Sequence, residues 1–434
     1  MSKSSLLLFT LFASSVSSAS SNKVQLIVDT DLGFDVDDVG ALAVANHLAD
    51  IGKCDILGVV HNTAFYEGIG GVDVVNDWYN RSGDQDKLRL GAYTGQWGSS
   101  GGQDAYTTTI EHDFPAAVSN YDEVPSAVDA YTAMLSGALN GSVVIASIGE
   151  LTNLRDILKA EPELFGAKVK AIYYMDGGYN FGCGDSDGSG WSPWLGSTED
   201  CDGAAQYVIE HVPNATVKQV FSLNGGDVYT GSRFNGEDGC GAGPVKEAYQ
   251  IWTNYGSRPS WDPITVYLAV MGDESLWSAN TAETTTVDYY GRETYDTSNT
   301  SHNMYQSWVD SDHNGDVTKL LDDLMCAAPC GAPGGEGLCG NYTLQSMKNC
   351  YGDRGDGTGS HGADDLETPA DSSAGTMTLH ACQALCDATD GCDGVTVRLS
   401  TAAGSDGLVD CYRKGNIDLD ACDTYYPMDT WVKN

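Results

Sequence analysis

The sequence predicts an α/β fold, an open and mostly parallel sheet with helices on both faces, followed by a small disulfide-rich α+β module. Two observations predict it. Short apolar runs alternate with amphipathic stretches over residues 24–325, and such strand–helix alternation is typical of a parallel sheet. After residue 325, cysteine and turn-forming residues become dense, which is typical of a small domain that depends on disulfides.

Taken in order, the apolar runs predict five buried strands, VQLIV (24–28), DILGVV (55–60), SVVIASIG (142–149), AKVKAIYYM (167–175) and TVKQVFSL (216–223). Four stretches predict helices, DDVGALAVANHL (37–48), LTNLRDILKAEPELF (151–165), GAAQYVIEHV (203–212) and DPITVYLAVM (262–271). In parallel sheets, ligands bind beyond the carboxyl ends of the strands. The aspartate-rich stretch DTDLGFDVDD follows the first strand and therefore falls on that edge.

The chain divides into four predicted parts. Residues 1–19 combine a lysine, a short apolar run and small residues, which predicts a signal peptide and a secreted protein. Residues 22–325 form the α/β domain, residues 326–349 a linker rich in Cys, Gly and Pro, and residues 350–434 the small module. No later segment is apolar for long enough to cross a membrane.

The composition indicates which classes of partner and which cellular compartment suit the protein. The formal net charge of −39 argues against nucleic-acid polymers, whose binding requires basic groups, and favours a strongly solvated surface. Thirteen cysteines fit an oxidising compartment, and since the number is odd at least one is free or pairs between chains. Cys54 is the candidate for a buried thiol. Glycosylation sequons occur at Asn80, Asn140, Asn214, Asn299 and Asn341.

Five of the ten residues from 29 to 38 are aspartates. Aspartates at a helix N-terminus cap free N–H groups and interact favourably with the helix dipole, but this accounts for only one or two of them. Carboxylate oxygens suit a hard cation, and Ca²⁺ takes six to eight oxygen ligands. The stretch therefore predicts a Ca²⁺ site, with a capped helix and a solvated acidic loop as the alternative.

Four segments in the same order resemble the inosine–uridine-preferring nucleoside hydrolases. DTDLGFDVDDVGALA resembles their N-terminal signature with two additional residues, and GVVHN resembles a strand that ends in a ribose-binding Asn, here Asn62. IGELTNL resembles a turn whose first residue, here Ile148, offers its carbonyl to calcium. WDPITVYLAV resembles a helix that begins with a calcium-binding Asp, here Asp262. The resemblance covers about 300 residues.

The resemblance implies a role for each matched residue. Asp31, Asp38 and Asp262, with the Ile148 carbonyl, would bind Ca²⁺, which would hold ribose hydroxyls and a water. Asp37 would deprotonate that water, with Asp35 as a rival for this role or as an extra ligand. Asn62 would contact the sugar. Asp29 has a strong alternative role, because a carboxylate just inside such a loop often ties the loop down.

The sequence departs from the family on the side of the leaving base. Many relatives have a His before the DP aspartate, where this chain has Trp261, and many have an ExN pair that is not visible here. Asn180 is the amide best placed to replace it. Trp191 and Trp194 either stack on substrate or pack their own loop, which a Cys183–Cys201 disulfide is expected to bridge. His61 and His112 are possible proton donors, although isolated histidines more often have structural or solvent roles.

Residues 350–434 resemble a PAN/apple domain, on TLHACQALCDATDGCDGVTV, DCYRKGNI and a final Cys422. The resemblance implies the disulfides Cys350–Cys422, Cys382–Cys411 and Cys386–Cys392, and a protein or carbohydrate ligand. The whole chain is thus expected to be a secreted, calcium-dependent hydrolase of ribonucleosides. The alternatives are hydrolysis of another N-ribosyl or glycosyl compound, and a non-catalytic protein that binds calcium and a ligand on the same fold.

Overall fold

The structure is a computed structural model, and it describes residues 23–65, 67–81, 88–96, 105–175, 203–223, 227–235, 243–272, 277–280, 284–289, 291, 293–296, 303–327, 329, 342–345, 349–352, 362–367, 372–377, 382, 385–386, 389–399, 409–419, 421–422 and 429–433. The predicted signal peptide lies outside these residues, as do Asn180, Cys183, Trp191, Trp194 and Cys201.

The large domain is built on a sheet of eight described strands in the order β3-β2-β1-β4-β5-β6-β12-β9. Neighbouring strands are parallel except for the pair β12 and β9 at one edge. This confirms the predicted mostly parallel sheet. The strands are β1 (Val24–Thr30), β2 (Cys54–His61), β3 (Arg89–Ala92), β4 (Val143–Ser147), β5 (Val169–Met175), β6 (Lys218–Leu223), β9 (Trp277–Asn280) and β12 (Met304–Val309).

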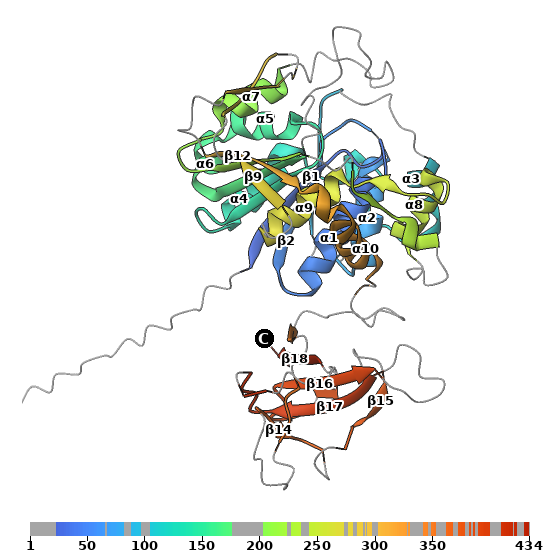
Figure 1. The fold of residues 1–434 in the computed structure, drawn as a ribbon. Helices are drawn as coiled ribbons and strands as arrows, with labels where there is room; N and C mark the ends of the chain where they lie inside the picture. The colour runs from blue at the N-terminus through green and yellow to red at the C-terminus, as the bar shows by residue number, and fades with distance from the viewer. Residues whose placement is uncertain are drawn as a thin grey trace, which may run out of the picture.

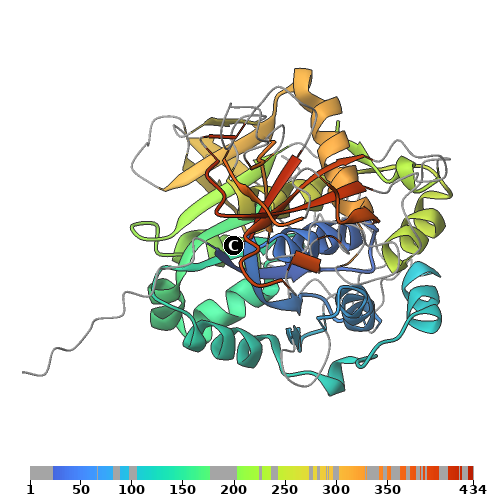
Figure 2. The ribbon, with the colours of Figure 1, turned by 90° about the horizontal axis from the view of Figure 1, so that it is seen from below.

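Helices cover both faces of this sheet (Figure 1). They are α1 (Asp37–Asp50), α2 (Gly68–Trp78), α3 (Ala105–Asp113), α4 (Ala127–Gly137), α5 (Thr152–Ala160), α6 (Pro162–Lys168), α7 (Ala204–His211), α8 (Pro244–Thr253), α9 (Trp261–Met271) and α10 (Asn314–Cys326). Helices α4 to α7 lie together on one face, and in the view from below the green α4–α6 group lies apart from the blue α1 and α2 (Figure 2).

The core explains why the strands are apolar along their whole length. In β1, Leu26 and Val28 pack into the cluster beneath α1 and α9, whereas Ile27 packs into the cluster beneath α4 and α5. All three side chains are fully buried. A strand covered on both faces cannot alternate apolar and polar residues, because both of its sides face helices.

One predicted helix is wrong in its extent. The stretch 151–165 forms two helices, α5 and α6, that are separated at Glu161. Pro162 is the cause, because a proline disfavours the helical conformation of the residue before it, and Glu161 adopts φ −136° and ψ 56°. Pro162 then occupies the start of α6, where its missing N–H costs no hydrogen bond.

The strand order indicates at which edge of the sheet a ligand is expected to bind. Chain connections from β1 run outward to β2 and β3, whereas β4, β5 and β6 extend the sheet on the other side of β1. In open α/β sheets, ligands bind outside the carboxyl ends of the strands where the order reverses. That point lies between β1 and β4, where Thr30 ends one strand and Ser147 ends the other.

Two short ribbons complete the large domain. The strands β7 (Tyr229–Thr230) and β8 (Arg258–Pro259) form one antiparallel pair, and β10 (Thr284–Val287) and β11 (Glu293–Asp296) form the other. Cys54 at the start of β2 is buried and free, as predicted for this thiol. Within the described chain, none of the helices combines the length and the apolar character that a membrane span requires.

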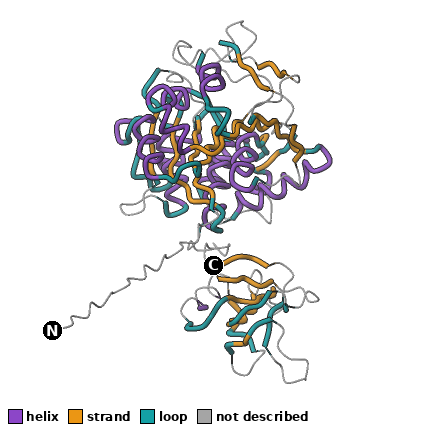
Figure 3. Tube along the Cα trace, turned by 90° about the vertical axis from the view of Figure 1, so that its left-hand side faces the viewer, coloured by secondary structure: helices purple, strands orange, loops and turns teal. Residues whose placement is uncertain are grey.

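The C-terminal part consists of antiparallel strands, with little helix among its described residues (Figure 3). The strand order is β13-β18-β16-β17-β14, and β15 also pairs with β17. These strands are β13 (Tyr342–Gln345), β14 (Asp364–Asp365), β15 (Gly375–Met377), β16 (Gly394–Leu399), β17 (Val409–Gly415) and β18 (Asp429–Lys433). β13 lies in the segment that the sequence analysis assigns to the linker, and it pairs with β18.

Disulfides supply much of the interior of this sheet. The structure contains Cys350–Cys422, Cys382–Cys411 and Cys386–Cys392, the three pairs that the resemblance implies. Four of these cysteines pack with Val395 and Val397 in one small cluster. Among the described residues this core is small and gives little hydrophobic stabilisation, and disulfides compensate by restricting the unfolded chain.

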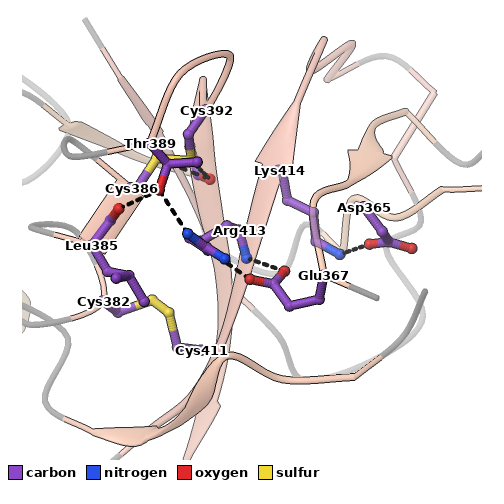
Figure 4. Close-up of polar contacts among 11 residues, drawn as sticks. Asp365, Glu367, Cys382, Leu385, Cys386, Thr389, Cys392, Cys411, Arg413 and Lys414 are labelled. Atoms are coloured by element: carbon purple, nitrogen blue, oxygen red, sulfur yellow. Dashed lines mark hydrogen bonds and ion pairs between the residues drawn. A yellow bond between two sulfur atoms is a disulfide. The ribbon is translucent and has the colours of Figure 1, made fainter. Parts of the chain in front are cut away.

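Two ion pairs join β14 and its neighbouring residues to β17 (Figure 4). The Lys414 ammonium contacts Asp365, and the two side chains are only 3% and 4% exposed. Arg413 donates to Glu367 at 2.6 Å and to Thr389 at 2.6 Å. Removal of one partner would leave a buried charge uncompensated, so these pairs fix how the edge of the sheet packs.

We predict that the two bodies fold independently. Met325 packs in the core of the large domain and Pro329 is buried, so a fragment of residues 20–329 keeps α10 intact. This fragment should unfold cooperatively on heating, as followed by circular dichroism. Residues 342–434 should fold only when oxidised. A fragment 20–329 without a cooperative transition would contradict the division.

Candidate metal and active site

Asp29 holds together the elements at the carboxyl end of β1. It lies at the end of β1, is fully buried, and accepts hydrogen bonds from Asn62 Nδ2 at 2.8 Å, Tyr131 Oη at 2.7 Å and Asn153 Nδ2 at 3.2 Å. These donors come from the end of β2, from α4 and from α5. Burial raises the pKa of Asp29 to about 7, against the lowering effect of the three hydrogen bonds. Asp29 is thus a structural anchor, the alternative weighed for it from the sequence.

The turn after β4 closes around the same anchor. Thr152 Oγ1 donates to the Asn62 carbonyl at 2.6 Å, and Asn153 Nδ2 also donates to the His61 carbonyl at 3.0 Å. Gly149 leaves no space for a side chain, because a Cβ there would lie 2.6 Å from Asp31 Oδ1 and 2.7 Å from Asn62 Nδ2. The IGELTN segment therefore brings the ends of β1, β2 and β4 into contact.

The acidic loop between β1 and α1 is fixed at two of its carbonyl groups. Tyr106 Oη, from α3, donates to the Asp35 carbonyl at 2.5 Å. His61 Nε2 lies 2.9 Å from the Leu32 carbonyl, while its Nδ1 lies 3.0 Å from the Thr63 carbonyl. Thr30 Oγ1 donates to the Asp38 carboxylate at the start of α1. The loop is therefore held in place by groups other than its own carboxylates.

Three carboxylates from distant parts of the chain meet at this edge. Asp35, Asp38 and Asp262 each offer an oxygen, and these oxygens lie within 4.8 Å of one another. Asp38 is 1% exposed and Asp262 is 3% exposed. Asp262 Oδ1 is buried without a hydrogen-bond partner, which is costly for a charged oxygen. Convergent oxygens that include an unsatisfied buried one are suited to a divalent cation.

Burial and the repulsion between neighbouring carboxylates shift the pKa values of this cluster upward. Burial and the neighbouring carboxylates raise the pKa of Asp31 to about 8. The same two causes, with burial first, raise the pKa values of Asp37, Asp38 and Asp262 well above the usual range. Asp31 is partly exposed and interacts with Asp38. It is therefore a neighbour of the three converging carboxylates and not one of them.

Arg258 contacts the cluster, and the sequence analysis did not find it. Its Nη2 pairs with Asp35 Oδ2, and its Nε lies 3.2 Å from Asp37 Oδ1. The second oxygen of Asp37 lies 3.5 Å from the backbone N of Asp262. The guanidinium also lies over the Trp261 ring, with Cζ 4.7 Å from the ring centroid. The only signal in the sequence is the position of Arg258, four residues before Asp262.

The other predicted site residues have definite surroundings. Asn62 is fully buried and its Nδ2 is used by Asp29, but its Oδ1 has no partner. Ile148 is buried directly after β4, and its N–H donates to the Asp29 carbonyl at 2.8 Å. Trp261 has one ring face occupied by Arg258. The contacts of His61 are with backbone carbonyls, and the side chain of His112 is 85% exposed and pairs with Asp113.

Comparisons with known proteins give matches among solved structures only, since no family model and no curated protein matches the chain. The inosine–uridine-preferring nucleoside hydrolase from Bacillus anthracis is 15% identical, covers 69% of this chain and 99% of its own, and has a TM-score of 0.48. The purine-preferring ribonucleoside hydrolase from Gardnerella vaginalis is 17% identical, covers 70% of this chain and 99% of its own, and has a TM-score of 0.48. The type III effector XopQ, whose structure is a complex with adenosine diphosphate ribose, is 16% identical, covers 71% of this chain and 94% of its own, and has a TM-score of 0.48. The contacts above, rather than these similarities, define the acidic site.

We predict that Asp29→Asn destabilises the fold. Asparagine has only one side-chain acceptor oxygen, so at least one of the three donors around position 29 loses its partner, at a cost of about 1–3 kcal/mol. Urea denaturation in EDTA measures the loss without any contribution from bound metal. Asp55→Asn is the matched control, because Asp55 is 56% exposed and its pairing with Lys23 at 3.5 Å contributes little. Equal stability of the two variants would contradict the anchoring role.

Proposed function

We propose that the protein hydrolyses the N-glycosidic bond of ribonucleosides to give ribose and a free base, and that the reaction depends on Ca²⁺. The convergence of Asp35, Asp38 and Asp262 at the carboxyl end of β1 carries this proposal. Four segments resemble the nucleoside hydrolases and occur in the same order, and this resemblance supports ribonucleosides as the substrate class.

The described residues fit the cation. Asp35, Asp38 and Asp262 would hold it, and the unpartnered Oδ1 of Asp262 would gain a ligand. The Asp31 carboxylate and the Ile148 carbonyl are the further ligands that we propose. Bound Ca²⁺ would supply positive charge that orients hydroxyl groups and lowers the pKa of water. It would also relieve the repulsion that raises the pKa values of the cluster.

The proposed hydrolysis requires two functions of the protein's own carboxylates, which are stabilisation of positive charge and acceptance of a proton. As the bond between the anomeric carbon and the base nitrogen breaks, positive charge develops on the sugar ring, and nearby carboxylates stabilise that charge. A carboxylate must also accept a proton from the attacking water, whose oxygen forms the new bond to the anomeric carbon. The base leaves with the bonding electron pair and takes up a proton.

We propose Asp37 as the proton acceptor, with Asp35 as its rival. The oxygens of Asp37 are not among those that converge, and one of them lies 3.2 Å from Arg258 Nε. Its contact with Arg258 disfavours protonation, whereas its burial and the charge of Asp35 favour protonation. Asp35 is more accessible, with a side chain that is 28% exposed against 1% for Asp37. The structure groups Asp35 with Asp38 and Asp262, which supports its role as an extra ligand.

On the substrate side, the unpartnered Oδ1 of Asn62 is available to a sugar hydroxyl. Trp261 can offer a base only the ring face that Arg258 does not occupy. Asn180 and Trp194 stay proposed contacts. The buried or solvent-directed positions of His61 and His112 do not support either as the acid that protonates the base.

Secretion and the appended module belong to the same proposal. Three disulfides favour an oxidising compartment, and the N-terminal apolar run is the export signal that we propose. We propose that the C-terminal sheet is an apple-like module that binds a protein or a carbohydrate. The second candidate function is non-catalytic binding of calcium and a ligand, favoured by Trp261 at the position where many nucleoside hydrolases have an acid.

Hydrolysis can be tested directly. Purified protein with Ca²⁺ should release free ribose from at least one of inosine, uridine, adenosine and guanosine. EDTA should abolish the release and added Ca²⁺ should restore it, because Asp38 and Asp262 would hold the ion that the proposed reaction needs. Calcium binding by calorimetry without ribose release from any of the four would favour the non-catalytic alternative.

Two amide substitutions separate the proton acceptor from the ligands. Asp37→Asn should keep calcium bound and lower kcat by about 10²–10⁴-fold, which is the usual contribution of a general base. Asp35→Asn should weaken calcium binding, since it removes a charged oxygen from the group of three. Asp312→Asn, at an exposed position, is the control. A fully active Asp37→Asn would move the role to Asp35.

A further inference from the structure

Arg258 is the cation that contacts the carboxylate cluster in the described part of the chain. Five carboxylates interact there, those of Asp31, Asp35, Asp37, Asp38 and Asp262. If all five were ionised, one guanidinium would compensate only a fifth of their charge. Any further cation that enters the site must therefore share these carboxylates with Arg258.

The backbone holds Arg258 firmly beside the cluster. Arg258 pairs with Thr230 in the β7–β8 ribbon, and the Ser260 N–H donates to the Val228 carbonyl at 2.9 Å. The hydroxyls of Thr230 and Ser260 lie 2.6 Å apart in a buried contact. Arg258 is thus fixed to the same short segment that begins α9 and presents Asp262.

The two carboxylates that contact Arg258 differ in what else they do. Asp37 binds the guanidinium with a buried carboxylate that does not belong to the group of three. Asp35 contacts the guanidinium and is also one of the three that converge. An oxygen that accepts a charged hydrogen bond from Arg258 is a poorer ligand for an ion, and two cations at one carboxylate repel each other.

We propose that Arg258 is a built-in counter-cation of the site, which competes with Ca²⁺ for Asp35 and so weakens the affinity of the site for the ion. This rests on the calcium site of the proposed function. The guanidinium stabilises the metal-free cluster, and Ca²⁺ must displace it from Asp35 in order to bind.

After displacement from Asp35, the guanidinium of Arg258 would keep its contacts with Asp37 and Trp261. Its contact with Asp37 at 3.2 Å and the Trp261 ring under it at 4.7 Å do not involve Asp35. Binding of the ion therefore breaks one contact of Arg258 and keeps two, so the exchange needs no movement of the ribbon. A cation–π contact with tryptophan is suited to this, because it tolerates small shifts of the planar guanidinium.

The experiment compares the full chain with Arg258→Gln, Arg258→Lys and Arg233→Gln. Glutamine removes the charge, and lysine keeps the charge but loses the planar fork that spans Asp35 and Asp37. Arg233 pairs with Asp323 on α10, where both side chains are more than 40% exposed, and serves as the matched control. The probes are Ca²⁺ alone, titrated by calorimetry, and thermal unfolding in EDTA and in Ca²⁺.

Arg258→Gln should bind Ca²⁺ with a Kd lower by about tenfold or more, since a competing charge in contact with the site has been removed. Its Tm in EDTA should fall below that of the parent protein, and its gain in Tm on addition of Ca²⁺ should be larger. Arg258→Lys should lie between the two, and Arg233→Gln should match the parent. The lysine variant gives the same test if the glutamine variant does not fold.

Other outcomes of the Ca²⁺ titration would contradict the competition or the calcium site itself. A Kd that is unchanged or higher in Arg258→Gln and in Arg258→Lys would overturn the competition, and a higher value would mean that Arg258 positions Asp35 for the ion. If the parent binds no Ca²⁺ but Arg258→Gln does, the competition is supported and the arginine closes the site. If none of the proteins binds Ca²⁺, the calcium site of the proposed function fails, and with it the competition.

Discussion

Mutual repulsion of buried carboxylates is the constraint on which the large domain depends. Five aspartates interact at one edge of the sheet, and burial raises the pKa values of four of them, Asp31, Asp37, Asp38 and Asp262. Such a group forms only if the surrounding structure fixes it. Tyr106 and His61 hold the backbone of the acidic loop, Thr30 bonds Asp38, and Arg258 compensates part of the charge. The sheet itself supplies the rigid edge on which these groups are built.

Asp29 and Asp38 show that residue type alone does not decide a role. Both are buried aspartates of the same segment. Asp29 is surrounded by three donors from β2, α4 and α5, and these use its acceptor capacity in holding the fold together. Asp38 has one hydroxyl donor and otherwise faces other carboxylates. The carboxylate with donors is part of the scaffold, and the one among like charges is available to a cation.

The sequence analysis identified the parts of the fold that depend on local patterns. The apolar runs located five central strands, and the acidic stretch located the edge of the sheet at which carboxylates converge. Arg258 and Tyr106 could not be found in this way, because each meets the acidic loop through a contact between residues more than 70 positions apart. The break at Pro162 has a local signal, which a continuous apolar pattern concealed. β13 was missed because its pairing partner, β18, lies at the end of the chain.

Trp261 and Arg258 are best understood together. Many nucleoside hydrolases have a His where this chain has Trp261, and a histidine that protonates a leaving base must carry a proton. Here that position lies against a guanidinium, whose charge would disfavour a second cation. An aromatic ring is favoured instead, since its π face attracts the guanidinium. The arginine that compensates the carboxylates would therefore disfavour a protonated histidine at 261, so the proposed hydrolase would protonate its leaving base from elsewhere or act on a base that needs less assistance.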